Sequence, residues 1–229
     1  MVKFLLITTL LWPMLAVAAD QPSLTELDRV IMHVPPTPLK WQTNLTFLIA
    51  EAEKGSTNAE MDLGLHYIFA VGTPQRLDKA LYWITKLADG NYPPAEYTLG
   101  LMYQSGVGVV SNQATADAWF LKATSQGYTP AKHQAALTLD REGKRGEALK
   151  LLRDAAEKGF PSSEYLMGCI ASDPIESYVW YSLAAPAIEL AGTRQLELQQ
   201  QLTKEQLAQA EERIRQFKQK QVEEQATGR

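Results

Sequence analysis

The sequence predicts an all-α fold, an α-solenoid of antiparallel helix pairs with a C-terminal capping helix. Segment 59–73 (AEMDLGLHYIFAVGT) is matched 36 residues later by segment 95–109 (AEYTLGLMYQSGVGV), which indicates an internal repeat. From about residue 41 onward, apolar residues recur at helical spacing, and no stretch shows the two-residue alternation of a half-buried strand. Because one helix pair cannot bury its own apolar faces, the pairs are expected to stack.

Residues 1–19 (MVKFLLITTLLWPMLAVAA) have the pattern of a cleaved signal peptide. Lys3 precedes an apolar run, and the segment ends in small residues, from Ala16 to Ala19, that suit signal peptidase. An uncleaved anchor and a buried apolar helix are the alternatives, although the run is short for a membrane span and Pro13 interrupts it. We therefore expect export, with no stable membrane insertion once the signal is removed.

The rest of the chain divides into three parts. Residues 20–40 hold four prolines and are expected to form a loosely ordered lead-in, because proline disfavours continuous helix. The repeat array is expected over 41–186, with units at about 55–90, 91–127, 128–159 and 160–186. Residues 187–229 are expected to form C-terminal capping helices and a frayed tail.

Composition and charge argue against several classes of function. The 229 residues are 45% hydrophobic and 21% charged, the balance of a soluble globular protein rather than of a disordered or membrane-embedded one. The formal net charge is −4 and the basic residues form no cluster, which argues against nucleic acid as a partner. A single cysteine, Cys169, allows no internal disulfide, so stability must come from packing alone.

Each unit is expected to pair a small residue on its first helix with a large residue on its second. The first helices are expected to begin at Ala59, Ala95, Ala131 and Ser163. Five positions further on, each carries a small residue: Gly64, Gly100, Ala136 and Gly168. The second helices carry a large side chain at Trp83, Trp119, Leu151 and Trp180. We expect the small residue to let the backbones approach, and the Trp to fill the space between the layers.

Proline and glycine mark the predicted helix ends. Where a first helix begins, the missing N–H of proline costs nothing, and the prolines found there are Pro93, Pro94, Pro130 and Pro161. Just past a second helix a left-handed cap residue is favoured, and the glycines found there are Gly90, Gly127 and Gly159.

Gly106 and Gly108 stand where a phosphate-binding loop and a structural turn are both conceivable. Two close glycines permit positive φ and a tight reversal between the helices of one pair. A P-loop would continue into Lys-Ser/Thr, but the sequence continues as Val109-Val110-Ser111. The repeat context therefore favours the structural turn.

Residues 48–186 resemble the Sel1-like repeat family, a relative of the tetratricopeptide repeats. Its pattern of Ala, Leu-Gly, Tyr, a Gly-Val loop, Ala-x-x-Trp and a closing Gly is clear in the second unit, from AEYTLGLMYQSGVGV to AWFLKATSQG. The third and fourth units depart from it, because LDREGKR (139–145) and IASD (170–173) replace the glycine loop. The segment 202–214 (LTKEQLAQAEERI) is similar to the closing helix of many bacterial members.

The resemblance implies a non-catalytic interaction, scaffold or regulatory module of the bacterial cell envelope. Such a module is expected to be periplasmic or secreted and to bind a protein partner through the solenoid groove. A cell-wall protein that binds or hydrolyses peptidoglycan is the alternative.

The residues that could perform chemistry do not converge in the sequence. Cys169 aligns with Leu65, Leu101 and Leu137 of the other units, which favours a core position over a reactive thiol. The histidines His33, His66 and His133 are scattered, without partners at metal-ligand spacing. Neither Ser-x-x-Lys nor Lys-Thr-Gly occurs, so no β-lactamase-like set is present. We expect no enzyme activity and no metal or cofactor.

The groove is expected to lie along the first helices. Helical phase suggests that residues three and seven positions after each start point away from the packed face: Asp62, His66, Thr98, Met102, Gln134 and Thr138. Tyr97, Met102 and Tyr165 are the side chains that a carbohydrate ligand would use. The mixture of side chains indicates no single ligand class.

The C-terminal segment 203–229 opens with a capping box, Thr203 to Gln206, and places apolar residues on one face: Leu207, Ala210, Ile214 and Phe217. We expect this helix to cover the open end of the solenoid. A dimerising coiled coil is the alternative, but the heptad run is short, so a monomer is favoured. From Lys218 onward little can be buried, and fraying is expected.

Overall fold

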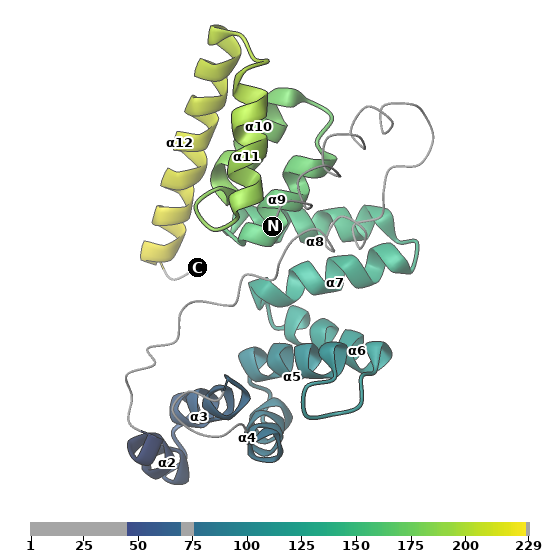
Figure 1. The fold of residues 1–229 in the computed structure, drawn as a ribbon, viewed down its shortest axis with the longest axis vertical. Coiled ribbons are helices and arrows are strands. Elements are labelled where there is room, and N and C mark those ends of the chain that lie inside the picture. Colours follow the sequence, from purple (N-terminus) through teal and green to yellow (C-terminus); the bar gives the residue numbers. More distant parts are fainter. Residues whose placement is uncertain (1–44, 70–75, 228–229) are drawn as a thin grey trace, which may run out of the picture.

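The computed structural model describes residues 45–69 and 76–227, and every regular element in those ranges is an α-helix (Figure 1). The predicted all-α fold is confirmed. The predicted signal peptide (1–19) and lead-in (20–40) lie outside the described residues. The helices are α2 (Leu45–Glu53), α3 (Thr57–Phe69), α4 (Leu77–Asp89), α5 (Pro93–Ser105), α6 (Gln113–Ser125), α7 (Thr129–Arg141), α8 (Arg145–Glu157), α9 (Pro161–Ile170), α10 (Pro174–Ala184), α11 (Glu189–Gln199) and α12 (Lys204–Thr227).

Helices α3 to α10 form four pairs, which we number units 1 to 4: α3–α4, α5–α6, α7–α8 and α9–α10. The two helices of each pair pack together, and each second helix also packs against the first helix of the next unit. In Figure 1 the units follow one another along the long axis, from α3–α4 at one end to the α9–α12 group at the other. This sequential packing is the arrangement of an α-solenoid.

The helices of a pair approach closely at a glycine, as predicted, but the large residue facing it is not the Trp. A Cβ on Gly100 would lie 2.5 Å from Cε1 of Phe120, and one on Gly64 would lie 2.7 Å from Cδ1 of Ile84. Phe120 and Ile84 are fully buried, whereas Trp83 and Trp119 are partly exposed. The predicted pairing of Trp with glycine is therefore wrong for units 1 and 2, although both Trp rings still pack against a core cluster.

The reason for this difference is helical phase. Successive residues are turned by about 100°, so the residue after the Trp faces the glycine while the Trp lies on the flank of its helix. There a lysine covers the ring: Lys86 Nζ lies 5.0 Å from the Trp83 centroid, and Lys122 Nζ lies 4.9 Å from the Trp119 centroid. Each Trp thus takes part in a cation–π contact at the surface.

The helix ends follow the predicted proline pattern and differ from the glycine pattern at one position. Pro93, Pro130 and Pro161 each stand in the first turn of a first helix. Gly127 and Gly159 have left-handed φ values of 84° and 79°. Gly90 instead has φ −75°, and Asn91 takes the left-handed position with φ 63°. Asn91, not Gly90, stands 36 residues before Gly127, and asparagine tolerates this conformation better than most residues.

The loop after α5 reverses the chain through Gly106 and Gly108, whose φ values are 75° and 74°. The Gly106 N–H donates to the Met102 carbonyl at 2.8 Å, which caps α5. A Cβ on Gly108 would lie 3.3 Å from Cβ of Leu77, so the loop lies against the start of α4. Both glycines therefore serve the turn and its packing.

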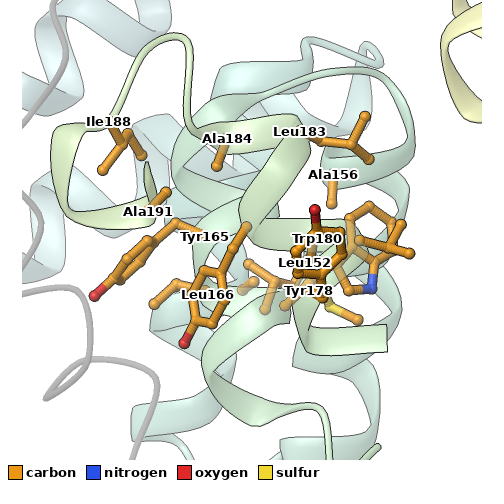
Figure 2. Close-up of a cluster of buried hydrophobic side chains, with 14 of the residues drawn as sticks. Leu152, Ala156, Tyr165, Leu166, Tyr178, Trp180, Leu183, Ala184, Ile188 and Ala191 are labelled. Carbon is orange, nitrogen blue, oxygen red and sulfur yellow. The ribbon is translucent and has the colours of Figure 1, made fainter. Parts of the chain in front are cut away.

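The largest apolar cluster joins α8, α9 and α10 to the two C-terminal helices (Figure 2). Trp180 is only 1% exposed there, and its ring lies 5.0 Å from the Phe217 ring of α12. The capping box forms, because Thr203 N–H donates to Gln206 Oε1 at 2.9 Å and Gln206 N–H donates to Thr203 Oγ1 at 3.3 Å. Helix α12 continues to Thr227, and its side chains from Lys218 to Glu223 are exposed except Gln221.

Among the helices of residues 45–69 and 76–227, none combines the length and the apolar character needed to cross a bilayer.

Candidate interaction surface

The side chains predicted to line the groove are mostly inside the structure. Asp62 is partly exposed, and burial raises the pKa of its carboxyl, with His66 acting in the opposite direction. The other predicted groove side chains are at most 9% exposed: His66, Tyr97, Thr98, Met102, Gln134, Thr138 and Tyr165. The expectation that positions three and seven point away from the packed face is therefore wrong for all but Asp62.

These side chains are buried because each first helix packs against neighbours on both flanks. Thr138 Oγ1 donates to Asp117 of the preceding unit at 2.8 Å, and Arg141 pairs with the same carboxylate at 2.7 Å. Gln104 Nε2 donates to Gln134 Oε1 of the following unit at 3.5 Å. Polar groups that sequence phase assigned to a groove thus connect successive units.

A narrower strip of the first helices does reach the surface. It lies six and ten positions after the helix start in units 1 and 2, and ten positions after it in unit 3, where Leu137 at the sixth position is buried. We define the first-helix strip by its partly or fully exposed members: Leu65, Phe69, Leu101, Ser105 and Arg141. Phe69 is 52% exposed. Apolar side chains predominate in units 1 and 2, and a guanidinium lies in unit 3.

An ion pair near the start of each first helix joins it to the second helix of units 1 to 3. Glu60 Oε1 lies 2.7 Å from Lys86 Nζ in unit 1. Glu96, which is fully buried, lies 3.0 Å from Lys122 Nζ and accepts from Gln126 Nε2 at 2.6 Å.

Unit 3 keeps the contact with the charges exchanged, since Lys132 pairs with Asp154. Sequence reasoning missed these pairs. The available signal was the Ala-Glu dipeptide at the start of units 1 and 2, with a lysine three residues after each Trp.

A small cleft opens where α9 ends early. Helix α9 has 10 residues, against 13 in α5, and α11 closes the opposite side. The cleft holds about 250 Å³ and is lined by Cys169, Tyr181 and Arg194 among others.

Cys169 is half-buried rather than part of the closed core. Its Sγ accepts a hydrogen bond from Tyr181 Oη at 3.4 Å, and burial raises the pKa of the thiol. The Leu-like position predicted for Cys169 is thus at the rim of the core.

The two described histidines are structural contacts. His66 is buried in α3, and His133 Nδ1 lies 2.9 Å from Ser163 Oγ with the Phe160 ring 5.3 Å away. His33 lies outside the described residues. Within the part of the chain that the structure describes, no group of three or more His, Cys, Asp or Glu side chains could hold a metal ion.

The Sel1 repeat family model matches residues 57–92, 93–128 and 163–185. The chain therefore contains three segments that match the Sel1 repeat. The matches cover units 1 and 2 and most of unit 4, whereas unit 3 folds as the pair α7–α8 without matching. No curated protein sequence matches the chain.

Solved Sel1-repeat structures have the same architecture. A protective antigen present in uropathogenic Escherichia coli strains, displaying an SLR fold, is 34% identical with a TM-score of 0.55 over 63% of this chain and 33% of its own. A Sel1 repeat protein from Oxalobacter formigenes is 26% identical with a TM-score of 0.55, covering 67% of this chain and 48% of its own.

The immunity protein Pa5087 from Pseudomonas aeruginosa, at 20% identity and a TM-score of 0.50, covers 71% of this chain and 64% of its own and shares the fold alone. The match to the first two structures spans about a third and about half of their lengths.

Proposed function

We propose that this Sel1-repeat protein is a non-catalytic scaffold of the bacterial cell envelope that binds a protein partner through the first-helix strip. Sel1 repeats generally mediate protein–protein interaction. The observation that carries the proposal for this chain is the strip itself, where Leu65, Phe69 and Leu101 present apolar surface on two neighbouring units. Exposed apolar surface of this kind is a common feature of protein-binding sites.

The stacked units support this role because they hold the strip in a fixed geometry. The Glu60–Lys86 and Glu96–Lys122 pairs fix each first helix to its second helix, and the Thr138–Asp117 contact fixes unit 3 to unit 2. A surface ordered before binding loses less conformational entropy when the partner docks. The partner expected is a segment with two or three apolar side chains.

The peptidoglycan alternative has less support. It relied on Tyr97, Met102 and Tyr165, which are between 2% and 5% exposed. Tyr97 instead packs against the rings of Phe120 and Tyr128. A sugar ring would have to displace core contacts to stack on these side chains.

Envelope location is part of the proposal and depends on residues 1–19, whose pattern is that of a signal peptide. The solved relatives named above come from bacteria, which agrees with a periplasmic destination. N-terminal sequencing of the protein from the periplasmic fraction tests this point. A first residue near Ala19 or Asp20 is expected, and recovery of Met1 would contradict export with cleavage.

The binding test uses matched charge substitutions and chemical cross-linking in envelope extract. Leu65→Glu and Leu101→Glu place a carboxylate in the strip and are expected to abolish the partner band. Tyr82→Glu and Val110→Glu place the same charge at side chains that are 62% and 89% exposed outside the strip, and the band should persist. Loss in all four variants, or in none, would remove the strip from the proposal.

A further inference from the structure

Helix α2 meets α3 in the same way that α4 meets α5. Four positions of the first apolar cluster recur 36 residues later in the next cluster: Leu48, Ala52, Ala59 and Leu63, then Ile84, Ala88, Ala95 and Leu99. The turn after α2 recurs too, because Gly55 has a left-handed φ of 86° and Asn91, 36 residues later, has one of 63°. Since α4 is the second helix of unit 1, α2 corresponds to the second helix of a preceding unit, which we call unit 0.

The flank of α2 that a first helix should cover is open within the described residues. Each of α4, α6 and α8 packs between two first helices, whereas the described helix against which α2 packs is α3, and α2 lies at the end of the array (Figure 1). Phe47 takes the position of Trp83, which packs against first-helix residues of its own unit. Phe47 is instead 57% exposed, and Leu45 and Ile49 of the same helix are partly exposed. An apolar surface therefore marks the place that a first helix of unit 0 would take.

The sequence before α2 has the pattern of such a helix. Ser23 and Glu26 have the spacing of a capping box, which favours a helix start at this point. Apolar residues follow at the spacing of one helix face: Leu24, Leu27, Ile31 and Val34. Pro35 and Pro36 then end the pattern, because proline cannot continue a helix. Segment 23–34 is thus an amphipathic helix by its sequence, with one apolar face to bury.

The position of this segment in the chain allows it to reach α2. Residues 35–44 connect it to α2, and this connection is longer than the loop 106–112, which reverses the chain between the two helices of unit 2. A segment tethered by a short linker has an effective concentration in the range of about 1 mM, so it competes well against a free helix of equal affinity. The segment also follows the predicted signal peptide and would remain in the exported chain.

We propose that residues 23–34 form a helix that docks on α2 beside Phe47 and completes unit 0 at the N-terminal end of the solenoid. The segment contains no glycine, so its helix is expected to pack on α2 at a longer distance than α3 packs on α4. Terminal units of a solenoid need such cover because their outer flank has no neighbouring unit. The lead-in 20–40, expected from its prolines to be loosely ordered, then contains one docked helix. This proposal does not depend on a partner at the first-helix strip.

The test is amide hydrogen exchange of the exported chain, residues 20–229. Amides of 24–34 should exchange at least about tenfold more slowly than in an unstructured peptide, as expected for a helix held by buried leucines. Phe47→Glu places a carboxylate on the α2 flank and should abolish this protection. Val110→Glu is the matched control at a side chain that is 89% exposed elsewhere, and it should leave the protection unchanged. Exchange of 24–34 at the unstructured rate in wild type would overturn the proposal.

The reciprocal variants lie in the segment itself. Leu27→Asp puts a charge on the apolar face and should speed the exchange of α2 amides by roughly tenfold, with α5 amides as the internal reference. Arg29→Asp changes the charge on the opposite face of the same predicted helix and should leave α2 protected. Unchanged α2 exchange in Leu27→Asp, or equal loss in both variants, would show that the apolar face of 23–34 does not cover α2.

Protein concentration distinguishes the chain's own segment from a second copy. Docking within one chain predicts a monomer mass by light scattering and the same protection of 24–34 over about a hundredfold range of concentration. Protection that rises with concentration, together with a dimer mass, would assign the α2 flank to another copy of the chain and overturn docking within one chain.

Discussion

Unit 2 (α5–α6) and unit 4 (α9–α10) repeat the same helix pair but satisfy their side chains differently. In unit 2, Trp119 lies at the surface beneath Lys122, which also pairs with Glu96. In unit 4, Trp180 is 1% exposed, and the place of the lysine is taken by Leu183. The Trp and the glutamate of unit 2 thus meet residues of the same unit, whereas unit 4 needs α12 to cover its Trp.

The difference shows how a repeat is adapted to the end of a solenoid. A terminal unit has no following neighbour, so its exposed flank must be covered by another element. Replacing lysine by leucine makes this flank apolar, and the Phe217 ring of α12 packs on the Trp180 ring at 5.0 Å. Stability at this end should therefore depend on α12, while the middle of the array should depend on contacts within and between units.

The largest loss of stability is expected when the side chain that faces Gly100 of unit 2 is truncated. Phe120 is fully buried, so Phe120→Ala should lower the free energy of unfolding by about 4 kcal/mol, the range for emptying a buried aromatic site. Trp119→Ala, one residue earlier, removes a partly exposed ring and should cost about 1–2 kcal/mol. Urea unfolding of both variants measures the contrast. A larger loss for Trp119→Ala would reverse the assignment of the core residue.

The close approach of the helices predicts a second, smaller effect. Gly100→Ala places a Cβ 2.5 Å from Phe120 Cε1, and the crowding should cost about 2–3 kcal/mol. Gly146→Ala in α8 is the matched control, because a Cβ there meets nothing within 4 Å. That variant should be stabilised by roughly 0.5–1 kcal/mol through helix propensity. Similar losses in the two variants would indicate a general intolerance of alanine rather than tight packing.

The repeat and its helix pairs could be predicted from sequence because they depend on local signals. Spacing, apolar periodicity and the prolines at helix starts are all readable along the chain. The small residues at Gly64, Gly100 and Gly168 indicate close approach correctly, but which neighbour meets them depends on rotation of the second helix. An error of one residue in helical phase turns the predicted side chain by about 100° around the helix. For this reason Trp119 was predicted to face Gly100, whereas Phe120 does.

The groove was harder to predict because its exposure depends on contacts between units. Phase on a single helix cannot show that Gln104 of the preceding unit meets Gln134, or that Asp117 of that unit meets Thr138. The contact between α12 and the end of α8 is more distant still, since Gln221, which donates to the Glu157 carbonyl, follows that residue by 64 positions. No local pattern connects these two positions.

Because unit 4 depends on α12, Phe217→Ala should lower the free energy of unfolding by a moderate amount. Phe217 is partly exposed, so this loss should be about 1–2 kcal/mol. Because Trp180 loses its cover, quenching of tryptophan fluorescence by acrylamide should increase. Leu121→Ala in α6 is the control, since Leu121 is 40% exposed and its loss should leave quenching unchanged. Unchanged quenching in Phe217→Ala would show that α12 is not what shields Trp180.

The smallest change in stability is expected at Cys169 of unit 4, whose counterpart in unit 2 is Leu101. The same position also predicts a difference in thiol reactivity. The Cys169 thiol is half-buried and accepts a hydrogen bond from Tyr181, and burial raises its pKa. Folded protein should therefore react with DTNB at least about tenfold more slowly than urea-unfolded protein, since the thiolate is the reacting form.

The matched comparison transfers the single thiol from the cleft to the first-helix strip. Cys169→Ala alone should cost about 1 kcal/mol, at the low end for a small core truncation. Adding Leu101→Cys to it moves the thiol to a partly exposed position of unit 2, away from Tyr181, and DTNB should react faster there than with wild-type Cys169. Rapid labelling of wild type in the folded state would show that the cleft opens readily to reagents. Because such opening requires movement of α11 away from α9 and α10, it would also mean that the C-terminal end is less firmly closed than the buried Trp180 indicates.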